Sequence, residues 1–365
     1  MVPSRDLCAA PDVTYLRRLT TDRGIWQHAR GDVPDTERGY SIDDVARALI
    51  VVNHATRIFP LLNAPLENDS RTLADLAEVY LNFLATYQLS NGRFHNFVSG
   101  QGAPADPVGS DDSFGRTIWA LGETIVSGIT PEHRARAGEL LRKSEARLTV
   151  TSSPRTNAFL LLGMSALAAA SPQSPTHPLV GPLVQDLLDR FQAHHVGDWA
   201  WFEDALSYSN AKIPLALFRS VPVLEAADDP RAPEAAAVAQ EALDFLLRET
   251  THEGIPAPIG NKGWYTRGST KPLYDQQPVD AAGMVLACLE AWRATLEDRY
   301  REAAESWLRW YEGGNVRHAS LLEDDGSVHD GISEDGVNAN RGAESLVTYL
   351  LARLRWAEVC CGIPV

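Results

Sequence analysis

Six segments of the chain place a cluster of polar residues directly before a long apolar run rich in small side chains. These segments begin at Gly39, Ser110, Ser153, Ser207, Asp275 and Asn338. A helix that is apolar on every face belongs in the interior of an all-helical domain rather than on its surface. Because polar groups recur at the same end of these helices, the pattern predicts a shared polar pocket at that end of the bundle.

Between these segments lie helices of a second kind, which are apolar on one face only. In residues 73–89, a single stripe contains Leu73, Leu76, Tyr80 and Leu84. Such a stripe marks a helix with one buried face and one wet face. The same pattern recurs at residues 131–148, 178–195, 232–249 and 298–312 and, as a shorter piece, at 11–20.

The alternation of the two kinds predicts about twelve helices in two concentric rings, with the apolar helices inside. Six inner and six outer helices make an all-α (α/α)6 toroid. We expect short strands or hairpins at the pocket rim near Gly92 and Gly197, and Pro-rich loops at residues 171–178 and 228–233. No charged or Gly/Ser-rich linker divides the chain, so we expect a single domain over residues 1–365.

Composition narrows the possible partners. The net charge of −15 argues against nucleic acid, whose binding requires clustered Lys and Arg, and is compatible with a neutral, polyhydroxylated substrate. The four cysteines have no zinc or redox spacing, and we expect no disulfide framework. No signal peptide and no membrane span is visible, so a cytoplasmic protein is expected.

Five motifs carry a resemblance to known proteins: GYSIDDVARAL, DDSFGRTIWALG, WAWFEDALSYSNAKIPLAL, DQQPVDAAGMVLACL and GVNANRGAESL. With them the chain resembles the (α/α)6 carbohydrate-active proteins. More closely, it is similar to the helical domain found beside or fused to bacterial sugar-transferase modules. The resemblance implies an oligosaccharide or glycoconjugate substrate and makes a glycosyltransferase a candidate partner.

Two pairs of adjacent acids begin the first two apolar helices. Asp43 and Asp44 follow Ser41 with near-capping-box spacing, and we expect Asp43 to pair with Arg47 one turn later. Asp111 and Asp112 repeat the arrangement, with Arg116 four residues after Asp112. Capping, ion pairing and repetition around the ring would explain both pairs without any function. Glycoside hydrolysis, however, needs two carboxyl groups on facing elements, which these positions could supply.

A third candidate acid is Glu203, next to Asp204 in the aromatic segment that contains Trp199 and Trp201. An acid among aromatic side chains suits a general acid, and the rings offer stacking faces for sugars. The alternative is a rim loop that the tryptophans merely pack.

The remaining candidates are polar residues near the other helix starts and in one loop. The neighbouring amides of Gln276 and Gln277 suit recognition of hydroxyl groups. The alternative is that they belong to a turn and form hydrogen bonds with its own backbone. Arg267 and Lys271, the cations of the loop that begins at Gly263, could hold an anion or simply be solvated. His95 is the histidine best placed to contact a sugar or transfer a proton. The candidates for substrate binding are Asp43, Arg47, His95, Asp111, Arg116, Trp199, Trp201, Trp264, Tyr265, Arg267, Lys271, Asp275, Gln276, Gln277, Asn338, Asn340 and Glu344.

These features favour a glycoside hydrolase that works without a cofactor or metal, with Asp44, Asp112 and Glu203 as its acid/base groups. Phosphorolysis and isomerisation or epimerisation of a sugar are the enzymatic alternatives. A non-catalytic glycan-binding domain that assists a glycosyltransferase is the third.

Overall fold

The computed structural model describes residues 5–64, 71–170 and 177–361. Its backbone groups into two compact units. The terminal unit contains Asp6–Thr149, Glu323–His329 and Ala339–Val365, and the middle unit contains Met1–Arg5, Val150–Leu322 and Asp330–Asn338. A single domain over the whole chain stays a prediction, and most of the Pro-rich loop 171–178 lies outside the described residues.

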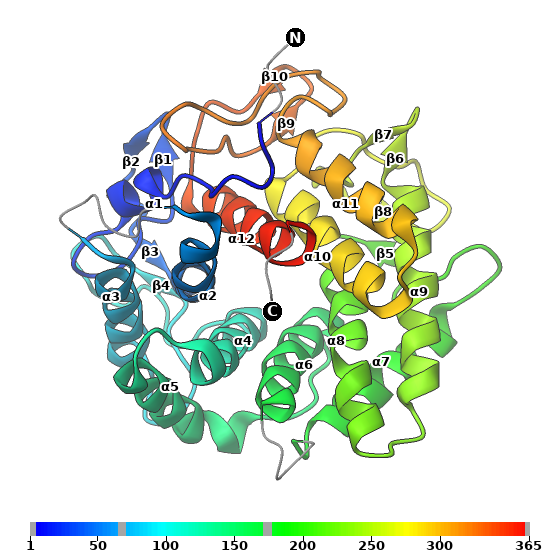
Figure 1. The fold of residues 1–365 in the computed structure, drawn as a ribbon, viewed down its shortest axis with the longest axis horizontal. Helices are drawn as coiled ribbons and strands as arrows, with labels where there is room; N and C mark the ends of the chain where they lie inside the picture. The colour runs from blue at the N-terminus through cyan, green and yellow to red at the C-terminus, as the bar shows by residue number, and fades with distance from the viewer. Residues whose placement is uncertain (1–4, 65–70, 171–176, 362–365) are drawn as a thin grey trace. The chain divides into compact units, whose positions relative to one another are not determined.

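The described part of the terminal unit has six α-helices, two 3-10 turns and four short strands (Figure 1). They are α1 (Thr14–Leu19), β1 (Ala29–Arg30), β2 (Val33–Pro34), β3 (Tyr40–Ser41), α2 (Ile42–Ile58), η1 (Pro60–Leu62), α3 (Leu73–Thr86), β4 (Phe97–Val98), α4 (Asp111–Ser127), α5 (Pro131–Ser144), η2 (Glu145–Arg147) and α12 (Ala343–Cys360).

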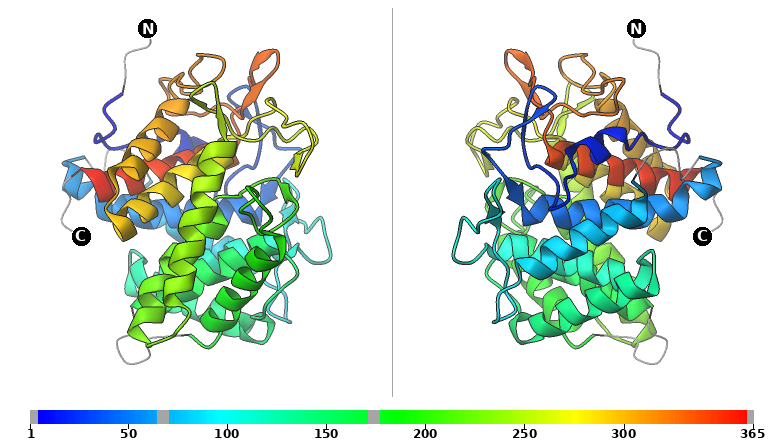
Figure 2. Two further views of the ribbon diagram at one scale, coloured as in Figure 1. Left: turned by 90° about the vertical axis from the view of Figure 1, so that its right-hand side faces the viewer. Right: turned by 90° about the vertical axis from the view of Figure 1, so that its left-hand side faces the viewer.

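Burial separates the helices of this unit into the two predicted kinds. Most residues of α2, α4 and α12 are buried, and α2 packs against both of the others. By contrast, α3 and α5 bury one face each and pack against each other, as the right-hand view of Figure 2 shows. The helices that are apolar on every face therefore lie in the core of this unit, and the helices that are apolar on one face pack over them.

The described part of the middle unit also has six α-helices. They are α6 (Pro154–Ala169), α7 (Val180–His194), α8 (Lys212–Ala226), α9 (Ala232–Glu249), α10 (Pro278–Thr295) and α11 (Asp298–Trp310). Here α6, α8 and α10 are the buried helices, and α8 packs against both of its buried neighbours. The one-sided helices α7 and α9 pack against each other (Figure 2, left), while α11 covers α10.

Side-chain caps explain where several of these helices begin. Ser110 and Ser153 accept hydrogen bonds from backbone amides in the first turns of α4 and α6, and Thr130 does so for α5. Ser41 caps α2 through the amide of Asp43, so the capping box expected with Asp44 is not formed. That leaves the Asp44 carboxyl group available for a different contact.

The strands are two residues long and pair as antiparallel ribbons. β3 pairs with β4, which confirms the strand expected near Gly92. Near Gly197 the chain forms a tight turn closed by Val196 and Trp199, and the strand β5 (Ala205–Leu206) follows and pairs with β8 (Tyr265–Thr266). The other ribbons of the middle unit are β6 (Thr251–His252) with β7 (Ile255–Pro256), and β9 (Ile332–Ser333) with β10 (Gly336–Val337).

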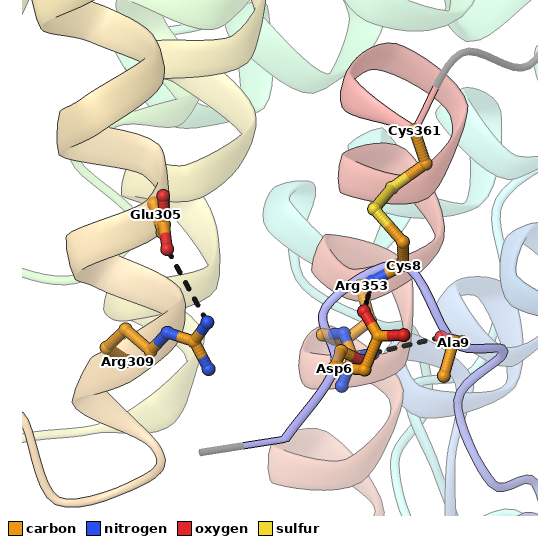
Figure 3. Close-up of a disulfide and its surroundings, with 7 residues drawn as sticks. All are labelled: Asp6, Cys8, Ala9, Glu305, Arg309, Arg353 and Cys361. Carbon is orange, nitrogen blue, oxygen red and sulfur yellow. Dashed lines mark hydrogen bonds and ion pairs between the residues drawn. A yellow bond between two sulfur atoms is a disulfide. The ribbon is translucent and has the colours of Figure 1, made fainter.

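A disulfide joins Cys8 to Cys361, 353 positions apart, so the expectation that no cysteines pair is wrong. Figure 3 shows the bond together with Arg353, which donates hydrogen bonds to the carbonyl groups of Asp6 and Ala9. Cysteine spacing could not reveal the pair because only the fold brings the N-terminal segment to the end of α12. Since disulfides are rare in the cytosol, the cytoplasmic location stays a prediction.

Candidate active site

Arg47 joins two carboxyl groups in the terminal unit. Its Nη2 atom donates to Oδ1 of Asp44 at 3.0 Å and to Oε2 of Glu344 at 2.8 Å. Asp44 precedes it on α2, whereas Glu344 lies in the first turn of α12. Because both oxygens contact one nitrogen, they are no farther apart than the sum of these two distances. The fold thus gathers two acids and a guanidinium from distant parts of the chain.

The two carboxyl groups of this cluster have opposite environments. The side chain of Asp44 is 6 % exposed and that of Glu344 is 44 % exposed. Burial away from water raises the pKa of Asp44 to about 7, outweighing the attraction of Arg47. Desolvation acts on Glu344 too, but nearby positive charges, chiefly Arg47, lower its pKa below the ordinary value. Near neutral pH, Asp44 is therefore partly protonated while Glu344 is ionised, a division of roles typical of acid/base sites.

A second arginine, Arg116 on α4, contacts the acids beside this cluster. It lies 3.2 Å from Oδ2 of Asp112 and 3.4 Å from Oδ1 of Asp43. The predicted pairing of Asp112 with Arg116 is confirmed. The predicted pairing of the Asp43 and Arg47 side chains is wrong, because Arg47 donates to the Asp43 carbonyl instead and its charged end turns toward α12.

His28 is a residue of this site that the sequence analysis did not select. Its charge contributes to the lowered pKa of Glu344, which places the exposed imidazole within electrostatic reach of that carboxylate. The neighbouring residue Gln27 accepts a hydrogen bond from the amide of Ala343 at 3.1 Å, and this contact holds the segment against the start of α12. No sequence spacing could have signalled the proximity.

Two other predicted residues of the terminal unit make contacts of their own. Asp111, half exposed, pairs with Arg93 at 2.6 Å. His95 places Nδ1 at 2.7 Å from the carbonyl oxygen of Asp106 and 3.5 Å from its carboxylate. A role for either in substrate binding stays a prediction.

In the middle unit, Glu203 pairs with Arg155 at 2.6 Å. Arg155 is buried, donates to Oδ1 of Asn210 at 2.9 Å and lies over the ring of Tyr208. The Glu203 side chain is 30 % exposed, so the carboxylate faces solvent and a guanidinium instead of the apolar surroundings assumed from the sequence. This polar cluster suits hydroxyl binding better than proton donation from a dry pocket.

The tryptophans beside Glu203 belong to the core, which corrects their assignment as stacking surfaces for sugars. Trp201 is fully buried, and its ring lies over Phe245 at 6.0 Å between centroids. Trp199 is 6 % exposed and contacts Phe245 edge-on. A ring with no accessible face cannot stack on a ligand, so these residues support the segment from beneath. Tyr265 lies edge-on to Trp199, and its role in binding stays a prediction, as does that of Trp264.

The positively charged loop is locally neutralised. Arg267 contacts the carboxylate of Asp204 at 2.9 Å, and Lys271 lies 3.9 Å from that of Glu249. Because each cation has an acidic neighbour, the local excess of positive charge inferred from the sequence is small. Anion binding by this loop stays a prediction.

The amides before α10 have different settings. Gln276 is buried, accepts from the indole of Trp310 and donates to the carbonyl of Leu273, so its expected contact with substrate is corrected to a role in packing. Asp275 and Gln277 are half-buried, and a role for them stays a prediction.

The residues before α12 divide between the two units. Asn340 accepts from the amide of Gly31 in the terminal unit, whereas Asn338 belongs to the middle unit. Substrate binding by both stays a prediction. The same holds for one pocket shared by all six helix heads, since Asp44, Asp112 and Glu344 lie in the terminal unit and Glu203 in the middle unit.

In residues 5–64, 71–170 and 177–361, no group of three or more His, Cys, Asp or Glu side chains is arranged to hold a metal ion. None of the described helices is long and apolar enough to cross a membrane. Catalysis without a cofactor stays a prediction.

No protein-family model and no curated protein matches the chain. Several solved structures match it over most of its length. A sugar epimerase from a ruminal bacterium has a TM-score of 0.73 at 13 % identity, covering 98 % of both chains. Cellobiose 2-epimerase from Bacillus thermoamylovorans has a TM-score of 0.72 at 11 % identity, covering 95 % of this chain and 96 % of that one. A GH76 α-mannanase from Bacteroides thetaiotaomicron has a TM-score of 0.59 at 10 % identity, covering 98 % and 96 %.

At these identities the likeness shows the fold, which is the (α/α)6 toroid that the helix pattern predicts. The neighbours are carbohydrate-active enzymes, as the resemblance in the motifs implies. The closer likeness to helical domains beside sugar-transferase modules, and a transferase partner, stay predictions.

Proposed function

We propose that the chain is a sugar epimerase in which the Asp44, Arg47 and Glu344 cluster transfers the proton. The proposal rests on one observation. Two carboxyl groups contact the same nitrogen of Arg47, and the pKa of one, Asp44, is raised while that of the other, Glu344, is lowered. A group with a pKa near the working pH can both accept and return a proton. The two epimerases resemble the chain more closely than the α-mannanase does, which supports this reaction over hydrolysis.

The chemistry needs only proton transfer and charge stabilisation. In an open-chain aldose, a base removes the proton from the carbon next to the aldehyde, and the electron pair of the broken C–H bond forms an enediolate. Return of a proton to the opposite face of that carbon inverts its configuration. The reaction consumes no oxidant or reductant. A guanidinium such as that of Arg47 stabilises the developing oxyanion.

The proposal gives each residue a separate task. Glu344, ionised near neutral pH and facing solvent, accepts the proton. Asp44, with a pKa of about 7, is partly protonated and returns a proton to the opposite face of the carbon. Proton exchange with solvent then restores both carboxyl groups. Arg116 adds positive charge next to Asp43 and Asp112.

Glycoside hydrolysis is the competing function, and the geometry restricts it. Inverting hydrolases keep their carboxyl groups about 6.5–9.5 Å apart to admit a water molecule, whereas retaining enzymes need about 5–5.5 Å. One nitrogen of Arg47 holds oxygens of Asp44 and Glu344 closer than the inverting range. For hydrolysis by this pair, that proximity favours the retaining arrangement over the inverting one.

Incubation in deuterium oxide separates the possibilities. Wild-type protein is mixed with glucose, mannose or cellobiose, and the products are followed by NMR. We expect an epimer that carries deuterium at the inverted carbon, with the rate lowered about 100-fold or more in Asp44→Asn and Glu344→Gln. Asp189→Asn, an exposed change on α7, is the matched control and keeps the wild-type rate.

Other products would contradict the proposal. Release of free glucose from cellobiose without epimer indicates hydrolysis, and release that depends on phosphate indicates phosphorolysis. Sugar binding with no incorporation of solvent deuterium into any of the three sugars indicates a non-catalytic glycan-binding protein.

A further inference from the structure

The terminal unit contains a cavity that shares no lining residue with the Asp44 cluster. Its volume is about 550 Å³, which lies within the range of pockets that take small molecules. It lies between the segment that follows α1 and the C-terminal half of α3, and its walls include Trp26, Tyr40, Asn82, Thr86 and Tyr87.

One wall of this cavity is a continuous series of aromatic rings. Trp26 stacks on Tyr40 with centroids 4.2 Å apart and planes at 17°. Tyr40 in turn contacts Phe83, and Phe83 lies 4.5 Å from Tyr87. Trp26 is half-buried, whereas the other three rings are buried, so the series forms a rigid wall with one partly accessible ring. Trp26 is therefore the ring of the series that offers part of its surface to a ligand, and the buried rings hold it in place.

Polar groups surround that wall. The hydroxyl groups of Tyr40 and Thr21 hydrogen-bond to each other at 3.1 Å. On α3, Asn82 and Thr86 are exposed and lie one helical turn apart, so their side chains line the same edge of the cavity. Asn82 donates to the carboxylate of Glu78 at 3.0 Å and Thr86 donates to the carbonyl of Asn82 at 2.7 Å, so the oxygen atoms of both side chains are left to accept from the hydroxyl groups of a sugar.

The lining of the cavity contains one cation, Arg23, and one anion, Asp22, so its charges balance, which indicates a neutral ligand. Arg23 donates to the hydroxyl group of Tyr87 at 3.4 Å, and Asp22 pairs with Arg71 at 2.9 Å. The guanidinium of Arg23 also rests on Gly102, where an added Cβ would lie 2.1 Å from Nη1. Gly102 has a φ of +92°, so its backbone and its lack of a side chain both allow this close approach.

We infer that this cavity, hereafter the aromatic cavity, binds one neutral sugar unit, separately from the proton-transfer cluster. An aromatic wall, a polar edge of amide and hydroxyl groups, and balanced charge together define the ligand class. The inference goes beyond the proposed function, because it concerns binding and holds whichever reaction the chain catalyses.

Titration with cellobiose tests the inference. Wild-type protein is expected to show two binding events per chain by calorimetry. Thr86→Trp fills the aromatic cavity and should weaken one event at least tenfold, whereas Asn82→Ala should weaken the same event several-fold. Thr149→Trp adds the same bulk at an exposed position of the terminal unit outside the cavity, and both events should persist. Thermal melting identifies any variant that fails to fold, and Asn82→Ala then carries the test.

Three outcomes would overturn the inference. These are an unchanged titration in both Thr86→Trp and Asn82→Ala, a single event that Glu344→Gln removes, and no binding of cellobiose to wild-type protein. Failure of the proposed function is distinguishable, since loss of epimer formation with both binding events intact contradicts the reaction alone.

Discussion

Arg47 and Glu344 are 297 positions apart in the sequence, and their side chains meet at 2.8 Å. The same nitrogen of Arg47 also contacts Asp44, so one cation controls the charge state of two acids. Asp44 is buried deeply enough for desolvation to dominate, whereas Glu344 faces solvent and stays ionised. This asymmetry leads to the first three predictions.

Removing the negative charge of Glu344 should lower the pKa of Asp44. Ionised Glu344 disfavours ionisation of Asp44 and so contributes to its raised pKa of about 7. In Glu344→Gln the carboxyl group of Asp44 should titrate at a lower pH than in wild type, as followed by carbon NMR. An unchanged titration would show that the two acids are not coupled through Arg47.

Burial of Asp44 should make folding stability depend on pH. Its folded pKa of about 7 lies above the ordinary 3.8, so between these values the folded protein holds the proton more tightly. The free energy of unfolding attributable to Asp44 therefore falls as pH rises from about 4 to about 7, by up to about 1.4 kcal/mol per pH unit. Urea denaturation at several pH values should show this slope in wild type relative to Asp44→Asn. Parallel profiles of the two proteins would contradict it.

Glu344 contributes in the opposite direction and in a lower pH range. Its pKa lies below the ordinary 4.5, so the stability it adds is present above that value and is lost as pH falls through its folded pKa. The comparison of wild type with Asp44→Asn cancels this contribution to the extent that Glu344 titrates alike in both proteins.

Replacing Arg47 with Met should destabilise the protein by about 3–5 kcal/mol, because the change leaves buried Asp44 without its cation. Arg47→Lys should cost less, since the positive charge remains. The loss is not zero, because lysine lacks the planar guanidinium group. Chemical denaturation measures both. Arg30→Met, at a side chain that is 73 % exposed in a surface ion pair, is the matched control and should change stability by less than about 1 kcal/mol. Equal losses for the buried and the exposed arginine would contradict the prediction.

Reduction of the bond between Cys8 and Cys361 should lower the free energy of unfolding by about 2–4 kcal/mol, because the bond restricts the unfolded chain across nearly its whole length. Melting temperatures with and without a reductant measure the effect. Cys8→Ser should reproduce the reduced value and lose its response to the reductant. A wild-type protein that melts at one temperature in both conditions would show that the bond does not contribute.

The sequence by itself determined the fold class. Helices that are apolar on every face alternate along the chain with helices that are apolar on one face. The first kind is stable only inside the core, and the second kind covers the core with its apolar face. Local rules also predicted the pairing of Asp112 with Arg116, because this contact spans four residues of one helix.

Only the tertiary structure decided which polar residues meet. Arg47 turns away from the side chain of its near neighbour Asp43 toward Glu344, the charge of His28 acts on the same carboxylate, and Cys8 is bonded to Cys361. Trp201 and Gln276 look like ligand contacts in the sequence but are buried in the core. Periodicity reports which face of a helix is buried, whereas the partner of a side chain on another helix depends on how the helices pack, and no spacing along the chain encodes that.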